Sequence, residues 1–260
     1  MREQIMLVVS DKFSAFCAGK DAITISQLRQ WLSGEQTPLF SQGRMVLVPG
    51  QGLGDDMVAE ILDMAPRAPN AGLYDFGPWY NRPKRASSHL SHKQDPHNTL
   101  ISEPRQIAED VFEMHLMIDE RGELMRDHQS GQHVQGMILI EAARQGPMAV
   151  TEAFYLPKDR KFSFVFNDMN IKYNRFAFPL DARLRYTVRE KETRKGSRFR
   201  FAGDLAVEQT GVQAAFFSFS FSIFEAGLVS RQEGMQAMEA LQGGLAAQRG
   251  AEAGDLAAVA

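Results

Sequence analysis

The chain has 260 residues, of which 44% are hydrophobic, and its formal net charge is −3. This length can build one large domain or two smaller ones, and the charge gives no broad basic surface for nucleic acid. The single cysteine, Cys17, cannot form an internal disulfide, which favours the reducing cytoplasm. The N-terminal apolar run covers only residues 5–9, and no stretch approaches 18 apolar residues, so we expect neither a signal peptide nor a membrane span.

Residues 1–80 alternate between strand and helix patterns. Apolar runs predict short strands over residues 5–9 and 45–48. Thr24 can cap a helix that carries Ile25, Leu28, Trp31 and Leu32. The pair Asp55-Asp56 can open a second helix, because negative charge suits the positive end of a helix dipole. This order predicts a small α/β region at the N-terminus.

Two groups of residues superficially suggest ligand sites. Gly50, Gly52 and Gly54 follow the second predicted strand, but they lack the Gly-Lys-Ser/Thr of a phosphate-binding loop, and their spacing misses the dinucleotide fingerprint. Five possible metal ligands have no ligand spacing: Cys17, His89, His92, Asp95 and His97. We therefore predict no cofactor and no metal.

Residues 65–98 contain five prolines and show neither a helical nor a strand period. They predict a long connection, with residues 81–98 as the linker proper. A basic run from Arg82 to Lys93 lies within it. This run is either a solvated linker or a docking surface for an acidic carrier protein.

Several strands in succession are expected in the predicted domain over residues 99–226. Apolar and polar residues alternate there with period two, which is typical of antiparallel strands with one dry face. The apolar positions include Leu184, Tyr186, Val188, Phe201, Leu205, Val207, Phe217, Phe219, Phe221 and Ile223. Lys195-Gly196 and Thr210-Gly211 can reverse the chain between strands. Residues 227–260 predict one helix followed by a loose tail.

Residues 133–157 predict a long helix with only three formal charges, on Glu141, Arg144 and Glu152. A surface helix has charges opposite one apolar stripe, whereas this segment is apolar nearly all round and should be buried. Gly146-Pro147 is expected to bend or restart the helix. A curved antiparallel sheet around one long buried helix is the hotdog architecture, so the predicted fold class is α+β with a hotdog domain.

Buried Glu141 and Arg144 require partners or a cavity, because an unpaired buried charge costs several kcal/mol. Three residues apart, they can pair with each other. Alternatively, both face a substrate tunnel, where Glu141 acts as acid or base and Arg144 holds an oxygen. His133 and Gly136 begin the helix, where free N–H groups suit a developing oxyanion. A capping histidine and simple helix packing at the glycine are the alternatives.

The sequence of residues 133–145, HVQGMILIEAARQ, closely resembles the signature of the A-factor biosynthesis hotdog family, the γ-butyrolactone synthases. The resemblance covers about residues 90–225, and includes His92-Lys93, Thr99-Leu-Ile-Ser, Asp110-Val-Phe112 and the region of residues 162–178. It implies transfer of a β-ketoacyl group from an acyl carrier protein to a small phosphorylated hydroxyl compound such as dihydroxyacetone phosphate. At the site we expect catalytic roles for Glu141, Arg144 and His133, and substrate binding by Gly136, Gln145 and Gln132.

The chain departs from the family pattern in three ways. Gln132 and Gln135 stand where the family usually has Asp and Pro, and only one hotdog repeat is recognisable. Because a single repeat exposes a strand edge, we expect a homodimer. Asp127-His128 lies near the histidine position of hotdog dehydratases, so a dehydratase or thioesterase acting on carrier-protein or coenzyme A thioesters is the alternative enzyme. A non-catalytic binder of acyl chains or lactones, with the N-terminal region as a docking module, is the third hypothesis.

Overall fold

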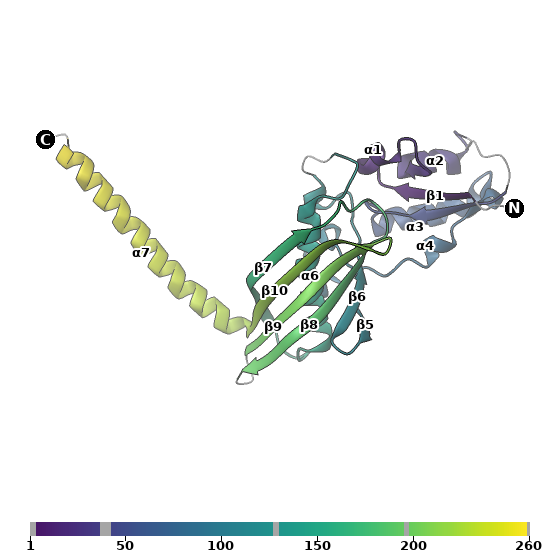
Figure 1. Ribbon diagram of the computed structural model, residues 1–260. Coiled ribbons are helices and arrows are strands. Elements are labelled where there is room, and N and C mark those ends of the chain that lie inside the picture. The colour runs from purple at the N-terminus through teal and green to yellow at the C-terminus, as the bar shows by residue number, and fades with distance from the viewer. Residues whose placement is uncertain (1–3, 37–42, 127–129, 195–197, 259–260) are drawn as a thin grey trace.

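The protein contains two β-sheets joined side to side, as the computed structural model shows (Figure 1). It describes residues 4–36, 43–126, 130–194 and 198–258. The N-terminal sheet is parallel, and the larger sheet is antiparallel. This arrangement confirms a hotdog fold preceded by a small α/β region.

The N-terminal sheet has the strand order β2-β1-β3-β4. Its elements are β1 (Gln4–Val9), α1 (Ser14–Cys17), β2 (Ala22–Thr24), α2 (Ile25–Ser33), β3 (Met45–Pro49), α3 (Asp55–Met64), β4 (Tyr74–Asp75) and α4 (Gly77–Tyr80). Thr24 caps α2, because its side chain accepts from the Gln27 amide while the Gln27 side chain accepts from the Thr24 amide. The predicted strands and helices of this region are thus confirmed.

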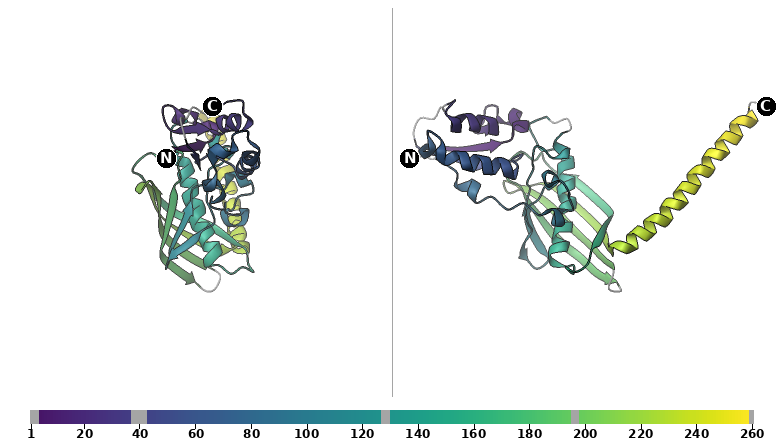
Figure 2. Two further views of the ribbon diagram at one scale, coloured as in Figure 1. Left: turned by 90° about the vertical axis from the view of Figure 1, so that its right-hand side faces the viewer. Right: turned by 180° about the vertical axis from the view of Figure 1, so that it is seen from behind.

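The hotdog sheet has the strand order β5-β6-β8-β9-β10-β7. Its elements are α5 (Ser88–Ser91), β5 (Arg105–Ala108), β6 (Val111–His115), α6 (Gly136–Phe154), β7 (Phe162–Tyr173), β8 (Arg183–Arg194), β9 (Arg198–Gln209), β10 (Val212–Glu225) and α7 (Ala226–Ala258). Short 3₁₀ turns are η1 (Asp11–Phe13), η2 (Ala65–Arg67), η3 (Ala71–Leu73), η4 (Pro96–Asn98) and η5 (Glu123–Met125). Seen from behind, α6 lies across this sheet (Figure 2).

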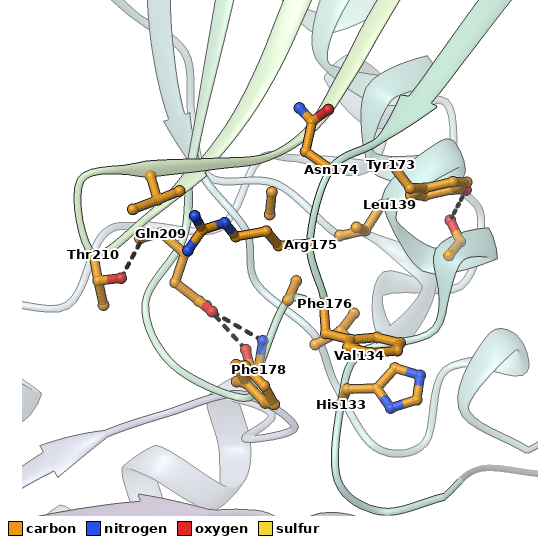
Figure 3. A pocket seen from close by; sticks show the side chains of 14 residues that line it. His133, Val134, Leu139, Tyr173, Asn174, Arg175, Phe176, Phe178, Gln209 and Thr210 are labelled. Carbon is orange, nitrogen blue, oxygen red and sulfur yellow. Dashed lines mark hydrogen bonds between the residues drawn. The ribbon is translucent and has the colours of Figure 1, made fainter.

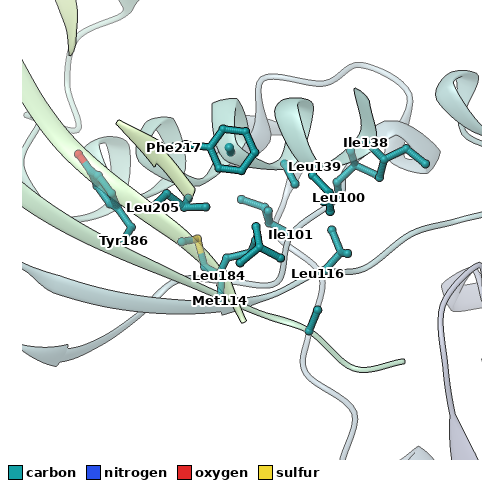
Figure 4. Packing of buried hydrophobic residues seen from close by; sticks show 14 of the residues in the cluster. Leu100, Ile101, Met114, Leu116, Ile138, Leu139, Leu184, Tyr186, Leu205 and Phe217 are labelled. Carbon is teal, nitrogen blue, oxygen red and sulfur yellow. The ribbon is translucent and has the colours of Figure 1, made fainter. Parts of the chain in front are cut away.

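The predicted dry face of the sheet packs against α6. Phe217 and Leu205 from the sheet meet Leu139 from the helix in one buried cluster (Figure 4). The alternating apolar positions of β10, from Phe217 to Ile223, are all buried. The predicted reversal at Thr210-Gly211 joins β9 to β10, with φ of 52° and 76°. The other predicted reversal, Lys195-Gly196, lies outside the described residues.

Three expectations about α6 require correction. The helix begins at Gly136, so His133 precedes it. Of the bend or restart expected at Gly146-Pro147, the restart is absent, because the helix runs on to Phe154. It is not buried on every side, because the sheet covers only one face, and Met137 remains 57% exposed.

The segment expected to be a linker instead packs along α6. It contains α5 and η4, and α5 lies against α6. The His92 side chain contacts Glu152, and the Lys93 side chain contacts Glu141. The two glutamates lie three turns apart on one face of the helix. The C-terminal region also differs from expectation, because α7 extends away from the sheet as one helix to Ala258 instead of becoming a loose tail (Figure 1).

The glycine loop after β3 joins the two sheets. A Cβ on Gly50 would lie 2.5 Å from the Pro179 carbonyl oxygen, and Gly52 has a φ of +88°. Between them, the Gln51 side chain donates to the Leu116 and Leu180 carbonyls and accepts from the Ile118 amide. These glycines are therefore required for close packing and backbone conformation at the junction.

Candidate functional site

The predicted site residues lie on two sides of α6. Gly136 and Leu139 line a large pocket, whereas Met137 and Glu141 line a small cavity. At 3.6 residues per turn, Leu139 and Glu141 point roughly 160° apart. The structure therefore brings His133 and Gly136 together in one place and separates them from Glu141.

Glu141 is the centre of a charged cluster. Arg144 grips it with two hydrogen bonds, Nε to Oε2 at 2.8 Å and Nη2 to Oε1 at 2.8 Å. Lys93 Nζ lies 2.8 Å from Oε1, and Gln145 Nε2 donates to the same oxygen at 3.0 Å. Among the alternatives for the two charges, the internal ion pair is present, and Glu141 lines a cavity as well.

The pKa of Glu141 reflects two opposed effects. Burial raises it, but the hydrogen bonds from Arg144, Lys93 and Gln145 outweigh burial and lower the pKa to about 2. The same contact with Glu141 raises the pKa of Arg144. A carboxylate held so strongly in its charged form is a weak proton acceptor at neutral pH. The cluster is suited to holding its two cations in place.

The two predicted substrate-binding glutamines make internal hydrogen bonds. Gln145 is 0% exposed, accepts from the Leu100 amide at 2.8 Å and donates to the Asn98 carbonyl at 2.8 Å. It therefore fixes the segment after α5 on the helix. Gln132 donates to the Ala15 carbonyl at 2.8 Å and so contacts the N-terminal region.

The small cavity has a volume of about 160 Å³ and contains a histidine–aspartate pair that the sequence analysis missed. His97 Nδ1 lies 3.0 Å from Asp119 Oδ2. Both residues line the cavity together with Lys93, Met137 and Glu141. The sequence carries no motif for this pair, because the two residues are separated by β5 and β6 and meet only in the folded chain.

Asp119 is fixed in its charged form. Its side chain is 3% exposed and accepts from the Arg121 side chain as well as from the Arg121 amide. Burial raises its pKa, but the hydrogen bonds from Arg121 and His97 lower it below the usual range. Arg121 also contacts Asp56 at the start of α3. That contact lowers the pKa of Asp56 to about 2.

The large pocket, of about 790 Å³, lies beside the start of α6 (Figure 3). Its walls are mostly apolar and include Val134, Leu139, Phe176 and Val212. The His133 ring packs on Phe176 with centroids 4.6 Å apart. The Tyr173 hydroxyl donates to the Gly136 carbonyl at 3.0 Å, and a Cβ on Gly136 would lie 2.8 Å from that hydroxyl. On that side the glycine serves helix packing.

Across the described ranges, no three His, Cys, Asp or Glu side chains are grouped so that they could hold a metal ion. No helix in these ranges is long and apolar enough to cross a bilayer. Asp127 and His128, the basis of the dehydratase alternative, lie outside the described residues.

Comparison with solved structures gives three examples of distant likeness. A conserved protein from Pseudomonas aeruginosa is 17% identical, with a TM-score of 0.36, over 47% of this chain and 87% of that one. A mutant thioesterase from the same organism is 12% identical, with a TM-score of 0.40, over 55% and 97% of the two chains. A thioesterase from Haemophilus influenzae is 16% identical, with a TM-score of 0.36, over 50% and 80%. Such low values carry no functional information.

No curated protein matches the sequence. The model of the A-factor biosynthesis hotdog domain does match, over residues 80–225. This range is more than half of the chain and contains α6, the whole hotdog sheet and both cavities beside α6. The chain therefore belongs to the A-factor biosynthesis hotdog family.

Proposed function

We propose that the protein is an acyltransferase that moves a β-ketoacyl group from an acyl-carrier-protein thioester to the hydroxyl of a small phosphorylated acceptor. Dihydroxyacetone phosphate is the acceptor chosen for testing, and the product would enter the synthesis of a butyrolactone-type signal or secondary metabolite in the cytoplasm. The observation that carries the proposal is the position of the family motif, whose Glu141 lines a cavity beside the Lys93 ammonium.

The charged cluster suits the binding of an anionic acceptor. Lys93 and Arg144 are both held by Glu141, and Arg144 remains 33% exposed. A phosphate that approaches these cations would bring its hydroxyl into the cavity. Exposed Met137 at the cavity provides an apolar surface for the acyl chain.

A homodimer is part of the proposal. β7 is an edge strand that pairs only with β10 in the described sheet, and it exposes Val165, Ile171 and Tyr173. Unpaired edges with apolar side chains are suited to pairing with another chain. A second copy paired there would bury these apolar side chains.

The test is a mixture of the protein, a β-ketoacyl carrier protein and dihydroxyacetone phosphate, followed by mass spectrometry. We expect a new ester and a free carrier-protein thiol, since a C–S bond breaks as a C–O bond forms. Release of the free acid would identify a thioesterase, and loss of water from a β-hydroxyacyl substrate would identify a dehydratase. No reaction with any of these substrates would contradict an enzymatic role.

The large pocket favours a second candidate function, the binding of an acyl chain or lactone. Its apolar walls enclose far more space than the cavity at Glu141, and it lies on the opposite side of α6. The Arg175 side chain, which reaches toward Gln209 and Thr210, has no hydrogen-bond or ion-pair partner in the described part of the chain (Figure 3). It could bind the polar end of such a ligand.

Val212→Trp should block this pocket, because Val212 lies in its wall and is 39% exposed, so that a larger ring can enter without disturbing the core. We expect at least a tenfold loss of affinity for a long-chain lactone, about 1.4 kcal/mol, measured by calorimetry. Val212→Ile is the matched control, with affinity close to wild type. Equal binding by wild type and Val212→Trp would show that the pocket is not the site.

A further inference from the structure

We propose that His97, oriented by Asp119, is the general base that activates the acceptor hydroxyl. This inference rests on the proposed acyl transfer and deepens it. Acyl transfer to a hydroxyl requires a group that takes the hydroxyl proton, and Glu141 is poorly suited to that task. Its carboxylate already accepts four hydrogen bonds or ion contacts from Arg144, Lys93 and Gln145.

His97 has the geometry that Glu141 lacks. His97 lines the same cavity as Glu141 and Lys93. Because Nδ1 faces a carboxylate, the proton of a neutral ring belongs on Nδ1, and the lone pair is on Nε2. Within the described residues Nε2 has no hydrogen-bond partner, and the side chain is 36% exposed. In the neutral ring Nε2 is thus an acceptor without a protein partner among the described residues.

Asp119 is a positioning residue in this arrangement. It is nearly fully buried, and the Arg121 guanidinium and amide hold its carboxylate in place. A fixed carboxylate selects one tautomer of the histidine and stabilises the imidazolium that forms when Nε2 takes a proton. The dyad is thus built for proton transfer at one defined nitrogen.

The N-terminal region braces this dyad. Asp56 at the start of α3 forms a salt bridge with the Arg121 guanidinium. Gly54, which caps α3, lies so close to the pair that a Cβ there would meet Asp119 Oδ2 at 2.3 Å and Arg121 Nη2 at 2.2 Å. The chain of contacts from Asp56 through Arg121 and Asp119 to His97 gives the N-terminal sheet a role at the site.

The step balances without another reactant. His97 Nε2 takes the hydroxyl proton as the acceptor oxygen attacks the thioester carbon. The tetrahedral intermediate then collapses, the C–S bond breaks, and the thiolate receives the proton from the imidazolium. One thioester and one alcohol become one ester and one thiol.

The test compares His97→Ala with wild type in the ester-forming assay. General bases contribute roughly 10²- to 10⁴-fold, so kcat should fall by that factor with little change in KM. Added imidazole should restore part of the lost rate in His97→Ala only. His115→Ala is the matched control: His115 Nδ1 also contacts an aspartate, Asp181, at 2.8 Å, but the residue lines neither cavity beside α6. Its kcat should remain at the wild-type value.

Asp119→Asn should also lower kcat, because the amide can donate to Nδ1 and so favour the tautomer with the proton on Nε2. Circular dichroism would verify that Asp119→Asn and His97→Ala are folded. If a variant is not folded, His97→Gln provides a second, milder change in the pair. Wild-type kcat in a folded His97→Ala, or in His97→Gln, would overturn the inference while leaving the transferase intact. Absence of ester formation by wild type would instead contradict the proposed function.

Discussion

Glu141→Gln is expected to lower the free energy of unfolding by roughly 3 kcal/mol at pH 7. The reason is that folding lowers the pKa of Glu141 from 4.5 to about 2, through its hydrogen bonds with Arg144, Lys93 and Gln145. The carboxylate is 18% exposed, so solvent screens these contacts only in part. The amide keeps the shape of the side chain but leaves two cations without a countercharge. Urea denaturation at pH 7 would measure the loss.

The stabilisation by the Glu141 carboxylate is expected to fall as the pH falls. Because the folded pKa lies below the unfolded value, the stabilisation is fully present above pH 4.5 and disappears as the pH falls toward 2. The difference between wild type and Glu141→Gln should therefore shrink over that range. Asp56 and Asp119, whose pKa values are also lowered, titrate in both proteins and cancel in the difference.

A matched control lies in the same cavity. Glu123 lines it without a salt bridge in the described part of the chain, so Glu123→Gln should change stability by less than about 0.5 kcal/mol. The proposed function adds a second readout, since displaced Lys93 and Arg144 would bind the acceptor poorly and raise its KM. A Glu141→Gln protein as stable as wild type at pH 7 would show that the ion cluster contributes nothing net.

The sequence predicts the hotdog fold well because its evidence is local. Period two along β8, β9 and β10 depends only on which side chains face α6, and each strand carries that pattern in its own residues. The apolar character of α6 is likewise visible within one continuous segment of the sequence. α6 is less buried than its apolar sequence predicts, because a single sheet covers one face and leaves Met137 exposed.

The site is less predictable because it is assembled from distant segments. Glu141 and Arg144 can be found within one helix, but His97 and Asp119 meet only once η4 packs near the turn after β6. In the sequence, His97 is one of several scattered histidines in a proline-rich stretch. No local period marks a residue whose partner lies beyond two strands, so only the folded chain reveals the pair.

The glycine loop illustrates the same limit. Its glycines suggest a phosphate site by composition. Their structural role, however, depends on contacts with the hotdog domain, whose residues are distant in sequence. Gly50 packs on Pro179, and Gly52 forms an isolated bridge with Asp119. The loop thereby joins the N-terminal sheet to the residue that orients His97, and its central side chain, Gln51, is the point at which this junction can be tested.

Gln51→Leu is expected to reduce the free energy of unfolding by roughly 3–5 kcal/mol. Gln51 is 4% exposed, and its removal leaves the Leu116 carbonyl and the Ile118 amide without the partners that now lie 2.9 Å away. Leucine fills the space but can neither donate nor accept, so buried main-chain groups would be unsatisfied. Thermal and urea denaturation would measure the loss.

The control is Gln106→Leu, at an exposed position of β5 whose side chain makes no hydrogen bond within the described ranges, and its stability should stay within about 0.5 kcal/mol of wild type. Because the loop also contacts Asp119, Gln51→Leu should lower kcat at a temperature where the variant is still folded. If stability falls while kcat is unchanged, the N-terminal sheet supports the fold but does not brace the dyad. If neither changes, the hydrogen bonds of Gln51 do not hold the two sheets together.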